Sequence, residues 1–155
     1  LCNAFENYFF LDLPIANPFD ENVFIGLNTR PYTIGNYTIL MDAYNANPSR
    51  MEASLNNFKK LEGTKTVILG DMFELGDESH QNHQKIAQLA IDNGMDNIYL
   101  IGKNFNQINI NSPKIFKFLD RNALTKYLNE HPIKTRNILI KGSHGMRLDL
   151  LESGL

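Results

Sequence analysis

The sequence has one cysteine, no long apolar run and almost no net charge. Cys2 alone cannot build an internal disulfide framework or a CxxC metal site, and it fits a reducing compartment. No apolar run approaches the roughly 20 residues of a membrane span, and no basic segment followed by an apolar stretch indicates a secretion signal. The formal net charge of -2 gives no electrostatic case for binding nucleic acid or an anionic membrane. We therefore expect a cytoplasmic protein.

Several catalytic and binding motifs are also missing. The sequence contains no GxxxxGK[ST] phosphate loop and no GxGxxG after its first strand. It lacks GxSxG and HExxH as well. His80 and His83 are three residues apart, but no carboxylate or cysteine joins them at a ligand spacing, so we expect no metal site there and a packing role for His83. If the chain handles a nucleotide, it supplies only part of the site.

At 155 residues the chain has room for one compact domain. Its first residue is Leu, which suggests a piece of a longer protein. Residues 1–28 are apolar and aromatic, with a short helix and a loop expected there, and residues 29–155 carry the regular pattern. We therefore divide the chain into a tail, 1–28, and a domain, 29–155.

The pattern of the domain alternates short apolar strands with amphipathic helices. Two β segments around Gly35-Asn36 predict a hairpin over residues 29–42. Further strands are predicted at residues 65–69, 97–101, 115–118 and 137–140. Such alternation predicts an α/β fold with a three-layer architecture, in which helices cover both faces of a mostly parallel sheet.

Three helices and a short C-terminal one are predicted between and after these strands. The first buries Met51, Leu55, Phe58 and Leu61 on one face, and begins either at Asn47 with Pro48 or in a capping box of Ser49 with Glu52. Asp77 or Ser79 is expected to cap the second, which runs to about Asn93 and ends at Gly94. Asp120 is expected to cap the third.

Polar loops follow three of the strands, at residues 42–47, 70–76 and 141–145. Ligands of parallel α/β sheets bind beyond the carboxyl ends of the strands, so these loops mark the expected site. An acidic residue at a strand end can hold ribose hydroxyls, and a following helix N-terminus can hold phosphate. Asp42, directly before a polar loop and a helix start, fits that arrangement.

The loops also carry a resemblance. The strings DAYNANP at residues 42–48, LGDMFELG at residues 69–76 and KGS at residues 141–143 resemble the C-terminal domain of a Mur ligase, of the type that adds D-Ala-D-Ala to the UDP-MurNAc-tripeptide in peptidoglycan precursor synthesis. The resemblance runs from Arg30 to the C-terminus, and residues 1–28 match only loosely the tail of the family's central ATPase domain.

The resemblance implies a three-domain, ATP-dependent enzyme in which this chain is the third domain. The N-terminal domain holds the UDP end, the central domain holds ATP and Mg²⁺ in its phosphate loop, and the C-terminal domain closes over the site. The tripeptide carboxylate is activated as an acyl phosphate, which the amine of D-Ala-D-Ala attacks. No catalytic residue is expected in this chain alone, and the isolated chain should be inactive.

Roles for individual residues follow from the resemblance. It implies an ATP-binding set of Arg30, Asp42, Tyr44, Asn45 and Asn47, and a peptide-binding set of Lys141, Gly142 and Ser143. The residues alone leave other roles open: turn residues and a helix cap for the first set, a surface lysine and a helix cap for the second.

Asp71 and Glu74 are two carboxylates in one strand-end loop, an arrangement that suggests acid–base chemistry. We expect them instead to shape the loop, cap a helix or pair with a basic residue. Two residues depart from the family pattern: Arg50 replaces the usual small residue after Asn-Pro-x, and His144 follows the KGS string where the family often has Arg or Asn.

Two functions of other classes stay open from the residues. One is a stand-alone, flavodoxin-like module that binds a nucleotide or another ligand, disfavoured because no Gly- or Ser/Thr-rich phosphate loop follows the first strand. The other is a non-catalytic interaction domain that has kept the fold.

Overall fold

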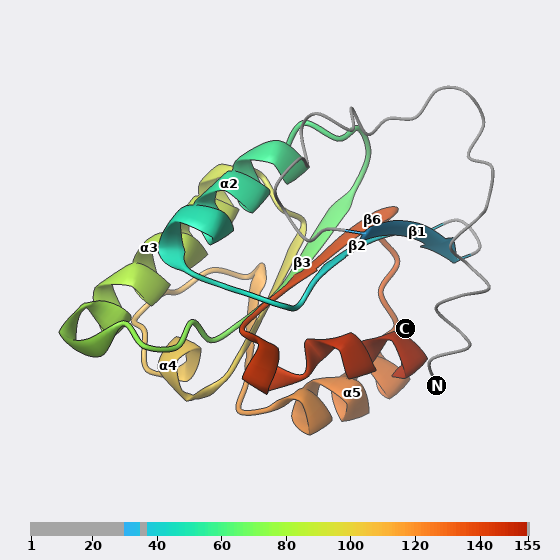
Figure 1. Ribbon diagram of the computed structural model, residues 1–155. Helices are drawn as coiled ribbons and strands as arrows, with labels where there is room; N and C mark the ends of the chain where they lie inside the picture. The colour runs from blue at the N-terminus through green and yellow to red at the C-terminus, as the bar shows by residue number, and fades with distance from the viewer. Residues whose placement is uncertain (1–29, 35–36, 155) are drawn as a thin grey trace.

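The computed structural model describes residues 30–34 and 37–154. The predicted tail at residues 1–28 and the predicted turn at Gly35-Asn36 lie outside the described residues. The described part contains a six-stranded sheet of order β1-β2-β6-β3-β4-β5 (Figure 1). Its strands are β1 (Arg30–Ile34), β2 (Tyr37–Asp42), β3 (Lys65–Gly70), β4 (Asn97–Ile101), β5 (Ile115–Phe118) and β6 (Asn137–Lys141).

The sheet is parallel except at one edge. β1 pairs with β2 in an antiparallel ladder that places Ile34 opposite Tyr37, as expected for two strands of a hairpin. The pairs β2–β6, β6–β3, β3–β4 and β4–β5 are parallel. The prediction of a mostly parallel α/β sheet is confirmed.

Helix α2 (Pro48–Phe58) begins at Asn47, which settles the two starts that the sequence left open. The side-chain oxygen of Asn47 accepts a hydrogen bond from the amide of Arg50 at 2.9 Å. Pro48 occupies the first turn, where its missing N–H costs nothing. An Asn cap followed by Pro therefore fixes the point at which the loop after β2 becomes a helix.

The start of helix α3 (Ser79–Asp92) differs from the prediction. A turn of 3₁₀ helix, η2 (Gly76–Glu78), precedes it, and its N-cap residue is Glu78 with no side-chain cap hydrogen bond. Neither Asp77 nor Ser79 caps it, because the 3₁₀ turn leads directly into the first helical residue. The predicted end is confirmed, since Gly94 follows the helix with a φ of 75°.

Helix α5 (Arg121–Glu130) begins as predicted. The carboxylate of Asp120 accepts a hydrogen bond from the amide of Ala123 at 2.8 Å. Two short elements were not predicted from the sequence: helix α4 (Lys103–Asn106) and the 3₁₀ turn η3 (His144–Met146). The predicted C-terminal helix is the 3₁₀ helix η4 (Leu148–Gly154). None of the described helices is long and apolar enough to cross a membrane.

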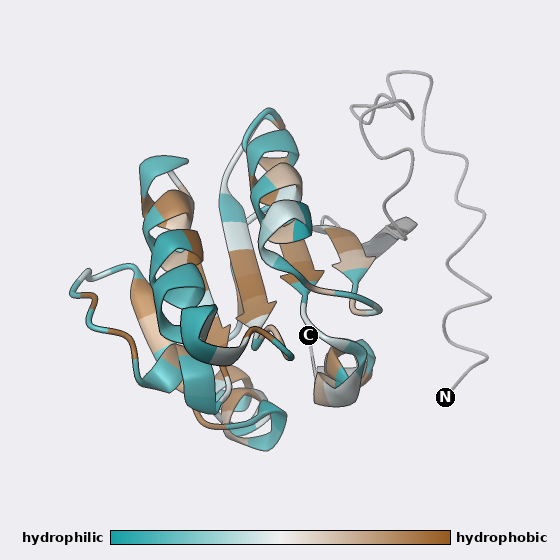
Figure 2. Cartoon of the chain, turned by 60° about the vertical axis from the view of Figure 1, so that its left-hand side comes forward, coloured by the Kyte–Doolittle hydropathy of each residue, from teal (hydrophilic) through white to brown (hydrophobic). Residues whose placement is uncertain are grey.

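The core consists of two apolar layers on opposite faces of the sheet. On one face, α2, α3 and α4 pack through residues such as Leu55, Ile86 and Phe105. On the other, α5 and η4 pack through Leu124 and Leu148. Figure 2 shows the apolar strands enclosed by helices whose outer faces are hydrophilic. Consecutive strand residues point to opposite faces, so these continuous apolar strands supply both layers.

The connections position the site. Loops after β2, β3 and β4 lead to the face covered by α2, α3 and α4, whereas those after β5 and β6 lead to the opposite face (Figure 1). β6 lies between β2 and β3, and β4 lies beside β5. Neighbouring loops therefore diverge at the carboxyl edge, the arrangement that opens a crevice for ligands in such sheets.

Candidate functional site

Asp42 and Lys141 join two of the predicted loops. They end the neighbouring strands β2 and β6 and lie opposite each other in the parallel ladder. The ammonium of Lys141 donates a hydrogen bond to the carboxylate of Asp42, and a second one to the carbonyl of Asn45 at 3.2 Å. The Lys141 side chain has no exposed area and that of Asp42 has 3%.

This burial decides what Lys141 is. The sequence left open that Lys141 is a surface lysine, and its burial shows that this interpretation is wrong. Burial lowers the pKa of Lys141 below its ordinary value, while the hydrogen bond that Lys141 donates to Asp42 acts in the opposite direction. A buried charge is tolerated only when it is paired and hydrogen-bonded, so each partner holds the other in place. The ammonium thus ties β6 to the loop after β2, and its role toward a peptide stays a prediction.

The rest of that loop is turned toward solvent. Tyr44 is 63% exposed, and Asn45 is also exposed. The rings of Tyr44 and His144 lie with their centroids 5.6 Å apart. His144, which departs from the family pattern, therefore meets an aromatic residue of the predicted nucleotide loop. Tyr44 and Asn45 are free to contact a ligand, while the Asn47 side-chain oxygen is already used by the helix cap.

Gly142 and Ser143 link the end of β6 to the loop after β3. A Cβ at Gly142 would lie 2.6 Å from the side chain of Leu148 and 3.1 Å from the Cα of Gly70, so only glycine fits. The Ser143 hydroxyl accepts a hydrogen bond from the amide of Phe73 at 3.3 Å. The Ser143 amide donates to the carbonyl of Asp71 at 3.4 Å. The KGS and LGDMFELG strings are thus in direct contact.

Asp71 and Glu74 occupy different environments. The buried carboxylate of Asp71 accepts hydrogen bonds from the amides of Asn104 and Phe105, each at 2.9 Å, at the start of α4. Glu74 is exposed and has a φ of 63°. Asp71 therefore joins the loop after β3 to the loop after β4, and Glu74 lies where that chain turns.

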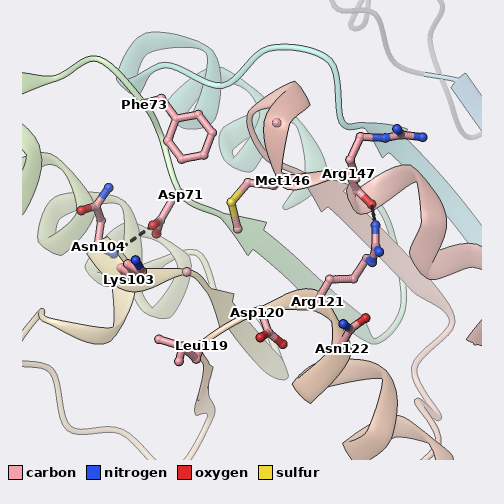
Figure 3. A pocket seen from close by; sticks show the side chains of 12 residues that line it. Asp71, Phe73, Lys103, Asn104, Leu119, Asp120, Arg121, Asn122, Met146 and Arg147 are labelled. Carbon is pink, nitrogen blue, oxygen red and sulfur yellow. Dashed lines mark hydrogen bonds between the residues drawn. The ribbon is translucent and has the colours of Figure 1, made fainter.

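A cleft of about 540 Å³ opens at this edge (Figure 3). It is lined by residues from the loops after β3, β4, β5 and β6: Asp71, Phe73, Gly102, Lys103, Asn104, Leu119, Asp120, Arg121, Asn122, Gly145, Met146 and Arg147. Among them, Asp71, Phe73 and Gly145 lie in the loops predicted from the sequence and Asp120 is the predicted helix cap, but the sequence assigned none of them to a cleft. The available signal was that residues 102–104 and 119–122 also follow predicted strands.

The cleft carries more basic than acidic side chains. Its basic lining residues are Lys103, Arg121 and Arg147, and its acidic lining residues are Asp71 and Asp120, whose carboxylates already accept backbone hydrogen bonds. The guanidinium of Arg121 donates to the carbonyl of Arg147 at 2.8 Å, a contact drawn in Figure 3. The Arg147 side chain pairs with Asp149 at 3.1 Å and lowers the pKa of that carboxyl.

Arg30, Arg50 and the potential metal ligands remain to be placed. Arg30 begins β1 opposite Met41, and its side chain lies outside the described part. Within residues 30–34 and 37–154, no group of three or more His, Cys, Asp or Glu side chains could hold a metal ion. Arg50 donates its amide to the α2 cap, and its charge helps to lower the pKa of Lys141.

The chain is similar to proteins of known function. Three UDP-N-acetylmuramoyl-tripeptide--D-alanyl-D-alanine ligases are similar in sequence. That of Rickettsia prowazekii is 34% identical over 75% of this chain and 27% of its own length. That of Bacillus subtilis is 33% identical over 76% and 29%. That of Escherichia coli is 32% identical over 74% and 26%.

Solved structures agree in fold. A crystal structure of MurF from Acinetobacter baumannii matches 82% of this chain and 28% of its own, with a TM-score of 0.71 at 24% identity. The MurF ligase from Thermotoga maritima, solved in complex with ADP, matches 81% and 29%, with a TM-score of 0.67 at 22% identity. At these identities the likeness shows the fold alone.

The chain spans a little over a quarter of the length of these relatives. The model of one family, described as "Mur ligase, glutamate ligase domain", matches residues 30–144. This match covers most of the chain and includes the predicted loops at residues 42–47 and 70–76 and residues 141–144 of the third. The chain therefore belongs to the Mur ligase family, as a glutamate ligase domain.

Proposed function

We propose that the chain is the C-terminal domain of an ATP-dependent ligase that adds D-Ala-D-Ala to the UDP-MurNAc-tripeptide during peptidoglycan precursor synthesis. The observation that carries this proposal is the 34% identity, over three quarters of the chain, to a ligase named for that reaction. The family model, which matches residues 30–144, supports the same assignment. Neither a stand-alone binding module nor a non-catalytic interaction domain is favoured by these relatives.

On the nucleotide side, the loop between β2 and α2 is proposed to face ATP. Tyr44 and Asn45 are exposed there, and the N-terminal turn of α2 has its first amides at the loop end. Asp42 is proposed to act at the ribose, with its buried pairing to Lys141 setting its orientation. Arg30 and Asn47 complete the proposed set. The related ligase from Thermotoga maritima was solved in complex with ADP, which supports an ATP-dependent enzyme.

On the peptide side, Lys141, Gly142 and Ser143 and the neighbouring cleft are proposed to take a peptide carboxylate. The Ser143 hydroxyl accepts from Phe73 but keeps its own proton to donate. The cleft beside it carries three basic side chains. Both peptide substrates bear carboxylates, and the Lys141 ammonium is proposed to act through the shape of the two loops it joins.

The chemistry is proposed to occur between domains. The tripeptide carboxylate becomes an acyl phosphate at the expense of ATP, and the dipeptide amine then displaces phosphate. The residues of this chain bind and orient substrates, with Asp71 and Glu74 shaping one loop. Mg²⁺ and ATP are proposed to be held mainly outside this chain, in the central domain of the enzyme. The cytoplasm is the proposed location.

The test is reconstitution with the intact enzyme that contains this domain. It is supplied with ATP, Mg²⁺, UDP-MurNAc-tripeptide and D-Ala-D-Ala, and phosphate and the pentapeptide product are both measured. Phosphate release is expected only when both peptide substrates are present, with L-Ala-L-Ala as the matched negative control. Phosphate release that ignores the dipeptide, or the absence of the pentapeptide product by mass spectrometry, would refute the proposal.

A further inference from the structure

His83 is a buried polar residue directly behind the cleft wall. It lies on α3 with no exposed area. Its Nδ1 donates to the carbonyl of Ser79 at 2.7 Å, and its Nε2 accepts from the amide of Met72 at 3.0 Å. The neutral ring with its proton on Nδ1 satisfies both bonds, and burial lowers the pKa of His83 in the direction that favours this form. Both ring nitrogens are therefore committed.

The ring is fixed from its other sides as well. Phe105 of α4 meets it edge-on, with centroids 4.6 Å apart and planes at 85°. The Asp71 carboxylate lies 3.8 Å from Nε2 and also holds the amide of Phe105. His80, one turn earlier on α3, is exposed. His83 therefore cannot turn without breaking a hydrogen bond at the loop after β3.

The residues it holds form the cleft wall. Met72 is followed by Phe73, which lines the cleft and is 45% exposed. The Phe73 amide donates to the hydroxyl of Ser143. Two successive amides are thus anchored on opposite sides, one to His83 and one to Ser143. Figure 3 shows the Phe73 ring beside Asp71 and facing the space near Met146.

We propose that His83 is a positioning residue for peptide binding: its acceptor nitrogen holds Met72, and so places Phe73 against the proposed peptide-binding loop at Gly142–Ser143. The inference rests on the proposed function. His83 touches no substrate and acts through the main chain of the wall. A purely space-filling role would need no acceptor, whereas an apolar ring here would leave the Met72 amide buried and unpaired.

Substitution of His83 by Gln or by Asn tests its two hydrogen bonds one at a time. Gln reaches approximately as far as Nε2 and keeps an acceptor for Met72, whereas Asn reaches only as far as Nδ1 and keeps a donor for Ser79. His83→Gln and His83→Asn are therefore a matched pair, with His83→Phe as the variant that removes both bonds. His131→Asn is the control, because His131 is exposed at the end of α5, stacked on Tyr127 at 4.2 Å.

The variants are made in the intact enzyme, and KM is measured for each of the three substrates. His83→Asn and His83→Phe are expected to raise the KM of D-Ala-D-Ala by about tenfold, the effect of losing one buried hydrogen bond, with the ATP KM unchanged. His83→Gln should restore the dipeptide KM. Equal KM values in all variants, or an equal rise for all three substrates, would overturn the inference, even if thermal stability falls.

Amide hydrogen exchange gives a readout that does not need activity. In His83→Asn, the amides of Met72 and Phe73 should exchange faster while the amides of β3 keep their protection, and His83→Gln should restore both. Unchanged exchange at Met72 and Phe73 would overturn the inference. If the unsubstituted enzyme makes no pentapeptide, the proposed function is refuted. The hydrogen-exchange measurement still decides whether His83 fixes the main chain at Met72 and Phe73.

Discussion

Lys141 and Asp42 face each other across β6 and β2 as a buried, hydrogen-bonded ion pair at the carboxyl edge of the sheet. The pair joins the DAYNANP and KGS strings, 99 residues apart in the sequence. Lys141 also holds the carbonyl of Asn45. The loops proposed to face ATP and the peptide therefore share one electrostatic contact.

Removing one partner should be costly to folding. Lys141→Met is expected to lower the free energy of unfolding by about 3–5 kcal/mol, because it leaves the Asp42 carboxylate buried and unpaired. The double variant Lys141→Met with Asp42→Asn should recover much of this loss. Lys85→Met breaks the exposed pair with Glu52 and should cost about 1 kcal/mol or less. Urea denaturation measures all four proteins, and similar losses for Lys141→Met and Lys85→Met would contradict the prediction.

The same pair predicts coupled kinetics. Asp42→Ala in the intact enzyme should raise the ATP KM and lower turnover, with a loss of about 1.5–3 kcal/mol for a charge-assisted hydrogen bond. Lys141→Ala should change ATP kinetics in the same direction, since it releases Asp42 and the Asn45 carbonyl. The double variant should be little worse than either single one, as for residues that act as a unit.

Varying each substrate in turn tests this coupling. The sequence alone predicts that Lys141→Ala weakens use of the peptide substrates more than use of ATP. A strictly peptide-specific effect that adds fully to that of Asp42→Ala would show that the ammonium contacts the peptide directly. The coupling through Asp42 would then be refuted.

The isolated chain should be catalytically silent. It has no phosphate loop, and its described carboxylates form no metal cluster, so it lacks the groups that position and neutralise a transferring phosphate. The purified 155-residue chain is expected to show no ATPase or ligase activity. Phosphate release above a blank, abolished by Asp42→Ala, would contradict this.

Gly102 should be intolerant of a side chain. It has a φ of 122°, and an added Cβ would collide with the Asp71 carboxylate, which two α4 amides hold in place. Gly102→Ala is expected to destabilise the domain by clearly more than the roughly 1–2 kcal/mol of a left-handed alanine. Gly94→Ala is the control, since its φ is 75° with nothing within 4 Å of the added Cβ. Equal changes in Tm would show that Asp71 moves aside freely.

Much of this fold could be predicted because its signals are local. Short segments rich in apolar residues identified each strand after the hairpin, and the Asn-Pro and Asp caps marked two helix starts. The start of α3 could not be predicted from capping residues, because a 3₁₀ turn leads into it without a side-chain cap. Helix α4 has four residues, too few for a periodic pattern, and depends on Asp71 from another loop.

The site was predictable in its loops but not in its contacts. Strand order is not readable from chain order: β6 is last in sequence yet lies between β2 and β3, and only this insertion brings Lys141 to Asp42. The cleft likewise combines Arg121 and Arg147 from loops after strands that are not neighbours. Those two residues carry no motif of their own, so only the folded arrangement reveals them.

The stability of the domain should depend on pH through His83. Burial lowers its folded-state pKa below the unfolded value of about 6.5, against the opposing effects of the Ser79 carbonyl and the Asp71 carboxylate and with a small contribution from His80. Above about pH 6.5 both states are neutral at this residue and the full contribution is present. As the pH falls below that value, the unfolded chain takes up a proton that the folded one refuses, so stability is lost.

We therefore expect the unfolding free energy of the unsubstituted protein to fall toward pH 5 more steeply than that of His83→Gln, by up to about 1.4 kcal/mol per pH unit. Chemical denaturation between pH 7.5 and 5 measures both curves, and their difference removes the titrations that the two proteins share. The same substitution at the exposed His131 should leave the slope unchanged. Parallel curves for the unsubstituted protein and His83→Gln would mean that the folded state accepts the proton, which the hydrogen bond from the Met72 amide to Nε2 opposes.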